Sequence, residues 1–167
     1  ERVRFLIAAG RVNEAVDVAA ATSISAEAEV LVAPERWERV ACLGMLIRAR
    51  LQIATGLARR SLPLLRHLKK LARDVRRYRR VIESLLLESS ALWQLNDRRG
   101  AQETLIEAVK LAAPNHALRM FIDEGGPVAQ ILEAAATRDV PAAVAFVEDL
   151  RRAFPALRPR VRQILTW

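Results

Sequence analysis

Cysteine and aromatic residues are scarce in this chain, and each shortage disfavours a class of structure. The single cysteine, Cys42, has no partner for an internal disulfide and lies in an apolar stretch, so we expect a small buried side chain and a reducing, cytoplasmic location. Aromatic residues make up 5% of the 167 positions and threonine is also rare, which disfavours sheets. No run of about 18 uncharged apolar residues occurs, so a membrane-spanning helix is not expected.

Motifs that bind phosphates, dinucleotides or metals are missing as well. No GxxxxGK[ST] or GxGxxG pattern occurs, and Gly125-Gly126-Pro127 lacks both the lysine and the preceding strand of a phosphate loop. The two histidines, His67 and His116, are far apart and have no cysteine or acidic group beside them at metal-ligand spacing. We therefore expect no cofactor, no metal and no catalytic residue, and interpret the chain as a binding module rather than an enzyme.

The residues that are abundant favour helices. Leu, Ala, Arg, Glu and Val dominate, and apolar residues recur at helical spacing from one end of the chain to the other. A long connection is expected over residues 22–33. The pattern predicts an all-α protein with helices over residues 2–9, 12–21, 36–55, 58–73, 76–95, 98–113, 116–123, 127–137 and 141–153.

Three segments share one plan, in which a helix ends at a turn residue and a small residue follows five positions later. The turn residues favour the left-handed conformation, and the small residues permit close helix packing. The pairs are Gly10 with Ala15, Gly56 with Ser61, and Asn96 with Ala101. Turns 46 and 40 residues apart indicate a degenerate tetratricopeptide-like array of helical hairpins, a right-handed α-solenoid.

Positive charge is concentrated in one part of the chain. The net charge is +8, and residues 59–80 contain ten lysines or arginines against one acid, Asp74. Such a density attracts nucleic acid or an acidic protein surface. The leucines between the charges recur every three residues, which is equally typical of an amphipathic helix with a solvated face. Pro63 in this segment requires that its helix begin near Arg60, so that the missing N–H falls in the first turn.

Four side chains are candidates for ligand binding on the concave face of the central hairpins: Arg50, Glu83, Ser90 and Trp93. Arginine offers a planar fork to a carboxylate or phosphate, a carboxylate accepts hydrogen bonds from hydroxyl or amine groups, and tryptophan offers a stacking surface. The alternative is that Trp93 packs between repeats while Arg50 and Glu83 pair with each other or stay solvated.

The C-terminal part carries a family resemblance. Residues 117–127, which contain the pattern R-x-F-x-D-E-G over Arg119–Gly125, resemble the end of the sensor region in MalT-type members of the LuxR family. Leu165-Thr166-Trp167 resembles the opening of the DNA-binding domain in those regulators. We expect residues 1–154 to form the helical-repeat sensor domain and residues 155–167 to form a basic linker. Because the chain begins in mid-pattern without a methionine, we also expect it to be a fragment.

The resemblance implies a regulatory sensor and interaction module of an ATP-dependent bacterial transcription activator. Its partner would be a small-molecule inducer or a regulatory protein, and its response would be relayed to self-association and to DNA binding. ATP and DNA would be bound by domains outside this chain. Two alternatives stay open: a protein-docking scaffold that binds no small ligand, and a basic helical repeat that contacts nucleic acid.

The absence of a phosphate-binding loop leads to a first prediction. The 167-residue chain should neither bind nor hydrolyse ATP, because nothing in its sequence provides the backbone cradle and the lysine that hold the phosphates. Isothermal titration calorimetry should register no stoichiometric ATP binding, and a stoichiometric binding curve would contradict the interpretation.

Overall fold

The computed structural model describes residues 2–22, 24, 26, 38–135 and 144–164, the last ten of these for the backbone alone. Each of the nine helices expected from the sequence is found among these residues, and an all-α, tetratricopeptide-like hairpin array is confirmed. The helices are α1 Arg2–Ala8, α2 Val12–Ala20, α3 Arg39–Ala54, α4 Ala58–Asp74, α5 Tyr78–Gln94, α6 Arg98–Ala112, α7 Leu118–Glu124, α8 Gly126–Ala134 and α9 Val144–Ile164, with a short 3-10 turn, η1 Ala113–Asn115, after α6.

Five of the helix ends share one turn geometry. The turn residue has a positive φ in each. The N–H of the turn residue and the N–H of the residue after it donate the same pair of backbone hydrogen bonds in all five turns. At Gly56, for example, the N–H of Gly56 donates to the carbonyl of Ile53 and the N–H of Leu57 donates to the carbonyl of Gln52. This pairing satisfies carbonyls that the helix end would leave unpaired. The turn residues are Gly10, Gly56, Arg76, Asn96 and His116.

From Gly56 onward these turns come every twenty residues. Gly10, Gly56 and Asn96 were expected from the sequence, whereas Arg76 and His116 were not, because arginine and histidine adopt the left-handed conformation far less often than glycine. Arg76 has φ 54° and His116 has φ 46°. The residue five positions after each turn is fully buried in every instance. These residues are Ala15, Ser61, Val81, Ala101 and Phe121, so burial rather than small size is their common property.

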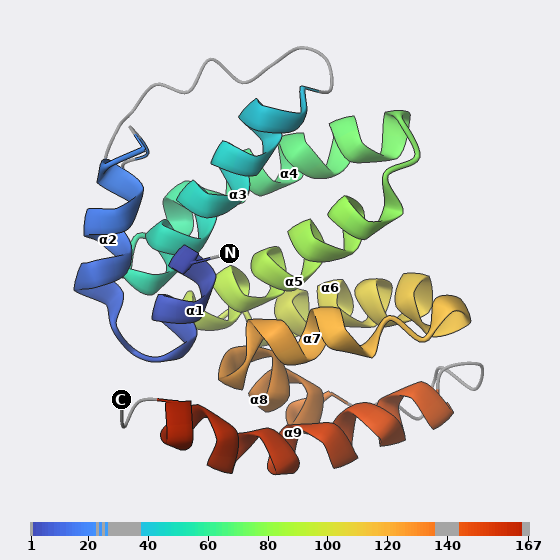
Figure 1. Cartoon of the computed structure of the whole chain (residues 1–167). Helices are drawn as coiled ribbons and strands as arrows, with labels where there is room; N and C mark the ends of the chain where they lie inside the picture. Colours follow the sequence, from blue (N-terminus) through green and yellow to red (C-terminus); the bar gives the residue numbers. More distant parts are fainter. Residues whose placement is uncertain (1, 23, 25, 27–37, 136–143, 165–167) are drawn as a thin grey trace.

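The equal spacing makes successive helices antiparallel neighbours. α3 packs on α4, α4 on α5 and α5 on α6, and the four lie side by side in Figure 1. Helices α1, α3, α5 and α7 also contact one another across the array, and α1 reaches α7. The array therefore has an inner face formed by these four helices, with the first hairpin folded back toward the C-terminal half. α9 packs against α7 and α8 along the lower edge of the view in Figure 1.

Helix α4 shows how the basic segment is accommodated. Leu65, Leu68 and Leu71 are buried, as the leucine spacing predicts, while the cations between them face solvent or other helices. Three cations of α4 pair with acids of later helices: Arg66 and Lys69 with Glu88, and Arg73 with Glu107. Cys42 is buried among apolar side chains of α3 and α4, as expected.

Two expectations about proline are wrong. The helix expected over residues 58–73 is confirmed as α4, but the later start near Arg60 that Pro63 was expected to require is not found. Pro63 therefore lies inside the helix, where it is exposed and removes one interior hydrogen bond. Helix α9 does not end at residue 153 but runs through Pro155 and Pro159 to Ile164. Apolar residues continue at spacings of three and four beyond Phe154, which favours helix despite the prolines. A linker role for residues 155–167 stays a prediction; residues 165–167 and most of the 22–33 connection lie outside the described part.

Across the described residues, no helix combines the length and apolar character that crossing a bilayer requires.

The turn geometry gives a second prediction. Gly56→Ala should destabilise the fold by about 1–2 kcal/mol, because a Cβ is strained at φ +81° even though no atom lies within 4 Å of it. Gly44→Ala is the matched control, since Gly44 lies inside α3 with equally open space around its Cβ. That control should stabilise by about 0.5–1 kcal/mol. Urea unfolding followed by circular dichroism measures the unfolding free energy of both variants. If both substitutions changed this free energy in the same direction, the role of the left-handed turn would be contradicted.

Candidate functional site

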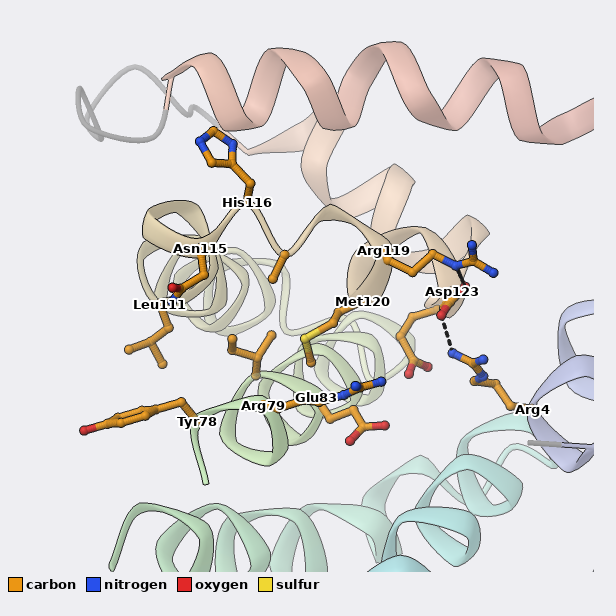
Figure 2. A pocket seen from close by; sticks show the side chains of 13 residues that line it. Arg4, Tyr78, Arg79, Glu83, Leu111, Asn115, His116, Arg119, Met120 and Asp123 are labelled. Atoms are coloured by element: carbon orange, nitrogen blue, oxygen red, sulfur yellow. Dashed lines mark hydrogen bonds and ion pairs between the residues drawn. The ribbon is translucent and has the colours of Figure 1, made fainter. Parts of the chain in front are cut away.

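The inner face carries a cluster of charged side chains with a pocket beside it. Arginines and carboxylates from α1, α3, α5 and α7 meet between these helices. The pocket, called the inner-face pocket below, has a volume of about 370 Å³. Its walls come from α1, α5, the end of α6 with the turn after it, and α7 (Figure 2). A volume in this range suits a small ligand.

Arg50 of α3 joins three helices at the centre of the cluster. It is 8% exposed, and its Nη2 donates to Oε1 of Glu124 on α7 at 2.5 Å and to Oε1 of Glu83 on α5 at 3.3 Å. Arg80 pairs with the other carboxylate oxygen of Glu83. Burial lowers the pKa of Arg50, but the two carboxylates outweigh burial and hold this pKa above its usual value. The guanidinium is therefore charged, and it ties together parts of the chain that are far apart in sequence.

Asp123 of α7 joins the two ends of the array. Its Oδ2 pairs with Nη1 of Arg4 on α1 at 2.7 Å, and its Oδ1 accepts from Nε of Arg119 at 2.9 Å (Figure 2). Burial raises the pKa of Asp123, but the hydrogen bonds and charges of the two arginines outweigh it, so this pKa lies below its usual value. Asp123 is therefore ionised at neutral pH, and the Arg4 contact holds α1 against α7.

The helices of the inner face fall within a known protein family. A family model of MalT-like TPR regions, where TPR denotes tetratricopeptide repeat, matches residues 1–138. The chain belongs to the MalT-like TPR family. The match covers α1 to α8 and therefore every helix that forms the inner face. Searches among curated proteins and among solved structures found no match.

The R-x-F-x-D-E-G pattern of this MalT-like region has a physical explanation in α7. Phe121 is fully buried and meets the ring of Phe146 edge to face, with centroids 5.4 Å apart. Asp123 and Glu124 point to the inner face, where they pair with Arg4 and Arg50. Gly125 ends the helix at φ 74°, a conformation that favours glycine. The pattern thus fixes α7 to α9 through its aromatic residue and to α1 and α3 through its two acids.

The predicted ligand-binding residues of the MalT-like region divide into two groups. Arg50 and Glu83 are brought together and pair with each other. Ser90 is buried and donates to the carbonyl of Leu86 at 3.0 Å, away from the inner-face pocket. Trp93 packs against the main core, and the Arg98 guanidinium lies 3.7 Å from its ring centroid. Of the four, Glu83 alone lines the pocket, and a ligand-binding role for any of them stays a prediction.

Sequence reasoning missed the acidic partners on α7 and the arginines that line the pocket. A signal was present: Arg119 stands four residues before Asp123, a spacing that pairs within one helix, while Glu124 has no cation at that spacing. An acid without a local partner, next to a helix-ending glycine, points to a partner on another helix. Which partner it meets depends on how α3 and α7 cross, and the sequence does not specify that.

The buried ion-pair cluster gives a third prediction. Arg50→Met should destabilise the fold by about 3–5 kcal/mol, because it leaves the buried carboxylate of Glu124 without its cation, whereas Glu83 keeps Arg80. The double variant Arg50→Met, Glu124→Gln should recover about half of that loss or more, since Glu124 is then neutral and Glu83 still has Arg80. Urea unfolding measures both. A double variant no more stable than Arg50→Met would contradict the electrostatic account and favour loss of packing by the Arg50 stem.

Proposed function

We propose that this MalT-like region is the sensor and interaction module of a bacterial transcription activator, and that its inner-face pocket receives a small-molecule inducer. The observation that supports the proposal is the pocket itself, which lies where helices from both halves of the array meet. The proposed role is recognition without catalysis. ATP binding and DNA binding are assigned in this proposal to domains outside the 167 residues.

A ligand in the pocket would contact helices that the ion pairs couple to the rest of the array. α5 and α7 line the pocket, Arg50 connects both to α3, and Arg4 connects α7 to α1. A ligand that binds more tightly to one arrangement of these helices shifts the population toward that arrangement. We propose that such a shift is relayed to self-association of the regulator and then to DNA binding.

One observation favours a second candidate function, a docking scaffold for an acidic protein or for nucleic acid. Basic side chains are exposed along α4 and at the turn that follows it, and no ion pair is found for them among the described residues: Arg59, Arg60, Lys70, Arg76 and Arg77. Charge of this density attracts acidic surfaces with little sequence preference and with strong salt dependence. We rank it second because none of these five side chains lines the inner-face pocket.

The experiment that tests the sensor role is a thermal-shift screen of the 167-residue chain against bacterial metabolites. A ligand present at one hundred times its Kd stabilises the fold by about 2.7 kcal/mol. For a chain of this size that corresponds to a rise in Tm of roughly 5–10 °C. We expect at least one metabolite to raise the Tm, because a ligand that binds the folded pocket and not the unfolded chain stabilises the fold.

Two tryptophan variants determine whether a hit occupies the pocket. Met120→Trp fills it, since Met120 projects into the pocket in Figure 2. Gln130→Trp is the control, because Gln130 is exposed on α8 and does not line the pocket. The Tm rise should disappear in Met120→Trp and persist in Gln130→Trp, with both variants helical by circular dichroism. A rise that persists in Met120→Trp contradicts the pocket assignment, and a screen without hits contradicts small-ligand sensing and favours the docking scaffold.

A further inference from the structure

The charges around the inner-face pocket do not balance. Five arginines contribute to the pocket or to the ion pairs beside it, whereas only three carboxylates do so, which leaves a surplus of two positive charges among the described residues. The arginines are Arg4, Arg50, Arg79, Arg80 and Arg119, and the carboxylates are Glu83, Asp123 and Glu124. Each of the three carboxylates has at least one arginine partner. A cationic ligand would therefore have to displace an arginine that is already paired.

Arg79 differs from the other four arginines. No ion pair is found for it within the described residues, although Glu83 stands four residues later on the same helix. Glu83 is instead paired with Arg50 and Arg80. Figure 2 shows the Arg79 side chain, which is partly open to solvent, extending from the start of α5 along the pocket. The pocket thus contains a guanidinium whose five N–H donors are not used by a carboxylate of the described chain.

Part of the pocket wall is apolar. Ile82 on α5 is 4% exposed, and Leu111 of α6 and Met120 of α7 are half-buried. These side chains cannot accept hydrogen bonds from Arg79, and they favour contact with hydrocarbon rather than water. The wall and the guanidinium together suit a ligand with an anionic end and an apolar body.

We propose that the inner-face pocket binds a small organic anion. The oxygens of its carboxylate or phosphate group accept hydrogen bonds from the Arg79 guanidinium, and its apolar body packs against Ile82, Leu111 and Met120. A guanidinium matches either oxyanion because its parallel N–H groups form two charge-assisted hydrogen bonds at once. This inference rests on the proposed function only in taking the pocket to be the ligand site.

The test uses four probes on the isotopically labelled 167-residue chain, followed by NMR. Hexanoate and hexyl phosphate carry the two oxyanions on one apolar body, hexanamide is the neutral counterpart of hexanoate, and inorganic phosphate lacks the apolar body. We expect hexanoate or hexyl phosphate to shift the resonances of pocket residues on α5 and α7 and to bind about tenfold or more tightly than hexanamide. The stronger of the two identifies the preferred oxyanion. Inorganic phosphate should bind more weakly than hexyl phosphate.

Two charge-removing variants locate the binding group. Arg79→Gln should weaken binding of the preferred anion about tenfold. Arg77→Gln is the matched control: Arg77 lies two residues earlier and is exposed like Arg79, but it does not line the pocket, and its loss changes the net charge equally. It should leave binding within about twofold of the unmodified chain, because a charge outside the pocket makes no hydrogen bond to the anion and is screened by salt.

Several results would overturn the inference. They are hexanamide binding as tightly as hexanoate, equal effects of Arg79→Gln and Arg77→Gln, and the absence of pocket shifts with either organic anion. These results are separable from a failure of the sensor role. A neutral metabolite that loses its thermal shift in Met120→Trp would support the sensor role while overturning anion binding. Anion binding that depends on Arg79, combined with metabolite shifts insensitive to Met120→Trp, would support this inference and contradict the assignment of inducer sensing to the pocket.

Discussion

The left-handed residue found at five of the helix ends is the constraint on which the rest of this structure depends. At five helix ends one positive-φ residue allows the same two backbone hydrogen bonds to form, so the chain reverses direction in the same way each time. From Gly56 to His116 the reversals come every twenty residues. Equal spacing keeps odd-numbered helices on one side of the array, and that side becomes the inner face where α1, α3, α5 and α7 meet.

An inner face built in this way brings charged groups out of water, and shared ion pairs compensate their charges. Arg50 pairs with two carboxylates, and Asp123 pairs with two arginines. Burying such groups costs desolvation free energy, and the pairs repay much of it only when all partners are in position. The cluster therefore contributes less to stability than an equal apolar area would. Its main effect is to fix which helices face one another, which accounts for the two acids of the R-x-F-x-D-E-G pattern.

The same arrangement is suited to a regulated module. Contacts within each hairpin are mainly apolar, whereas contacts across the inner face involve arginines and carboxylates near a pocket. Ion pairs respond to a nearby charge more readily than a packed apolar core does, because their energy depends on local charge and solvation. A ligand at the pocket would thus act on the interactions that orient the helices while the hairpins stay intact.

The sequence by itself determined the helices, three of the turns and the burial of the leucines in α4, because these follow from local preferences and from the spacing of apolar residues. It did not reveal the turns at Arg76 and His116, since arginine and histidine adopt the left-handed conformation far less readily than glycine and tertiary packing imposes it there. It placed Arg50 and Glu83 on one face and named Ser90 and Trp93 beside them, because helical spacing defines a face only approximately. Only the tertiary structure brought Glu124 to Arg50 and left Arg79 without an ion pair among the described residues, because both outcomes depend on the crossing of helices whose contacts span many residues of sequence.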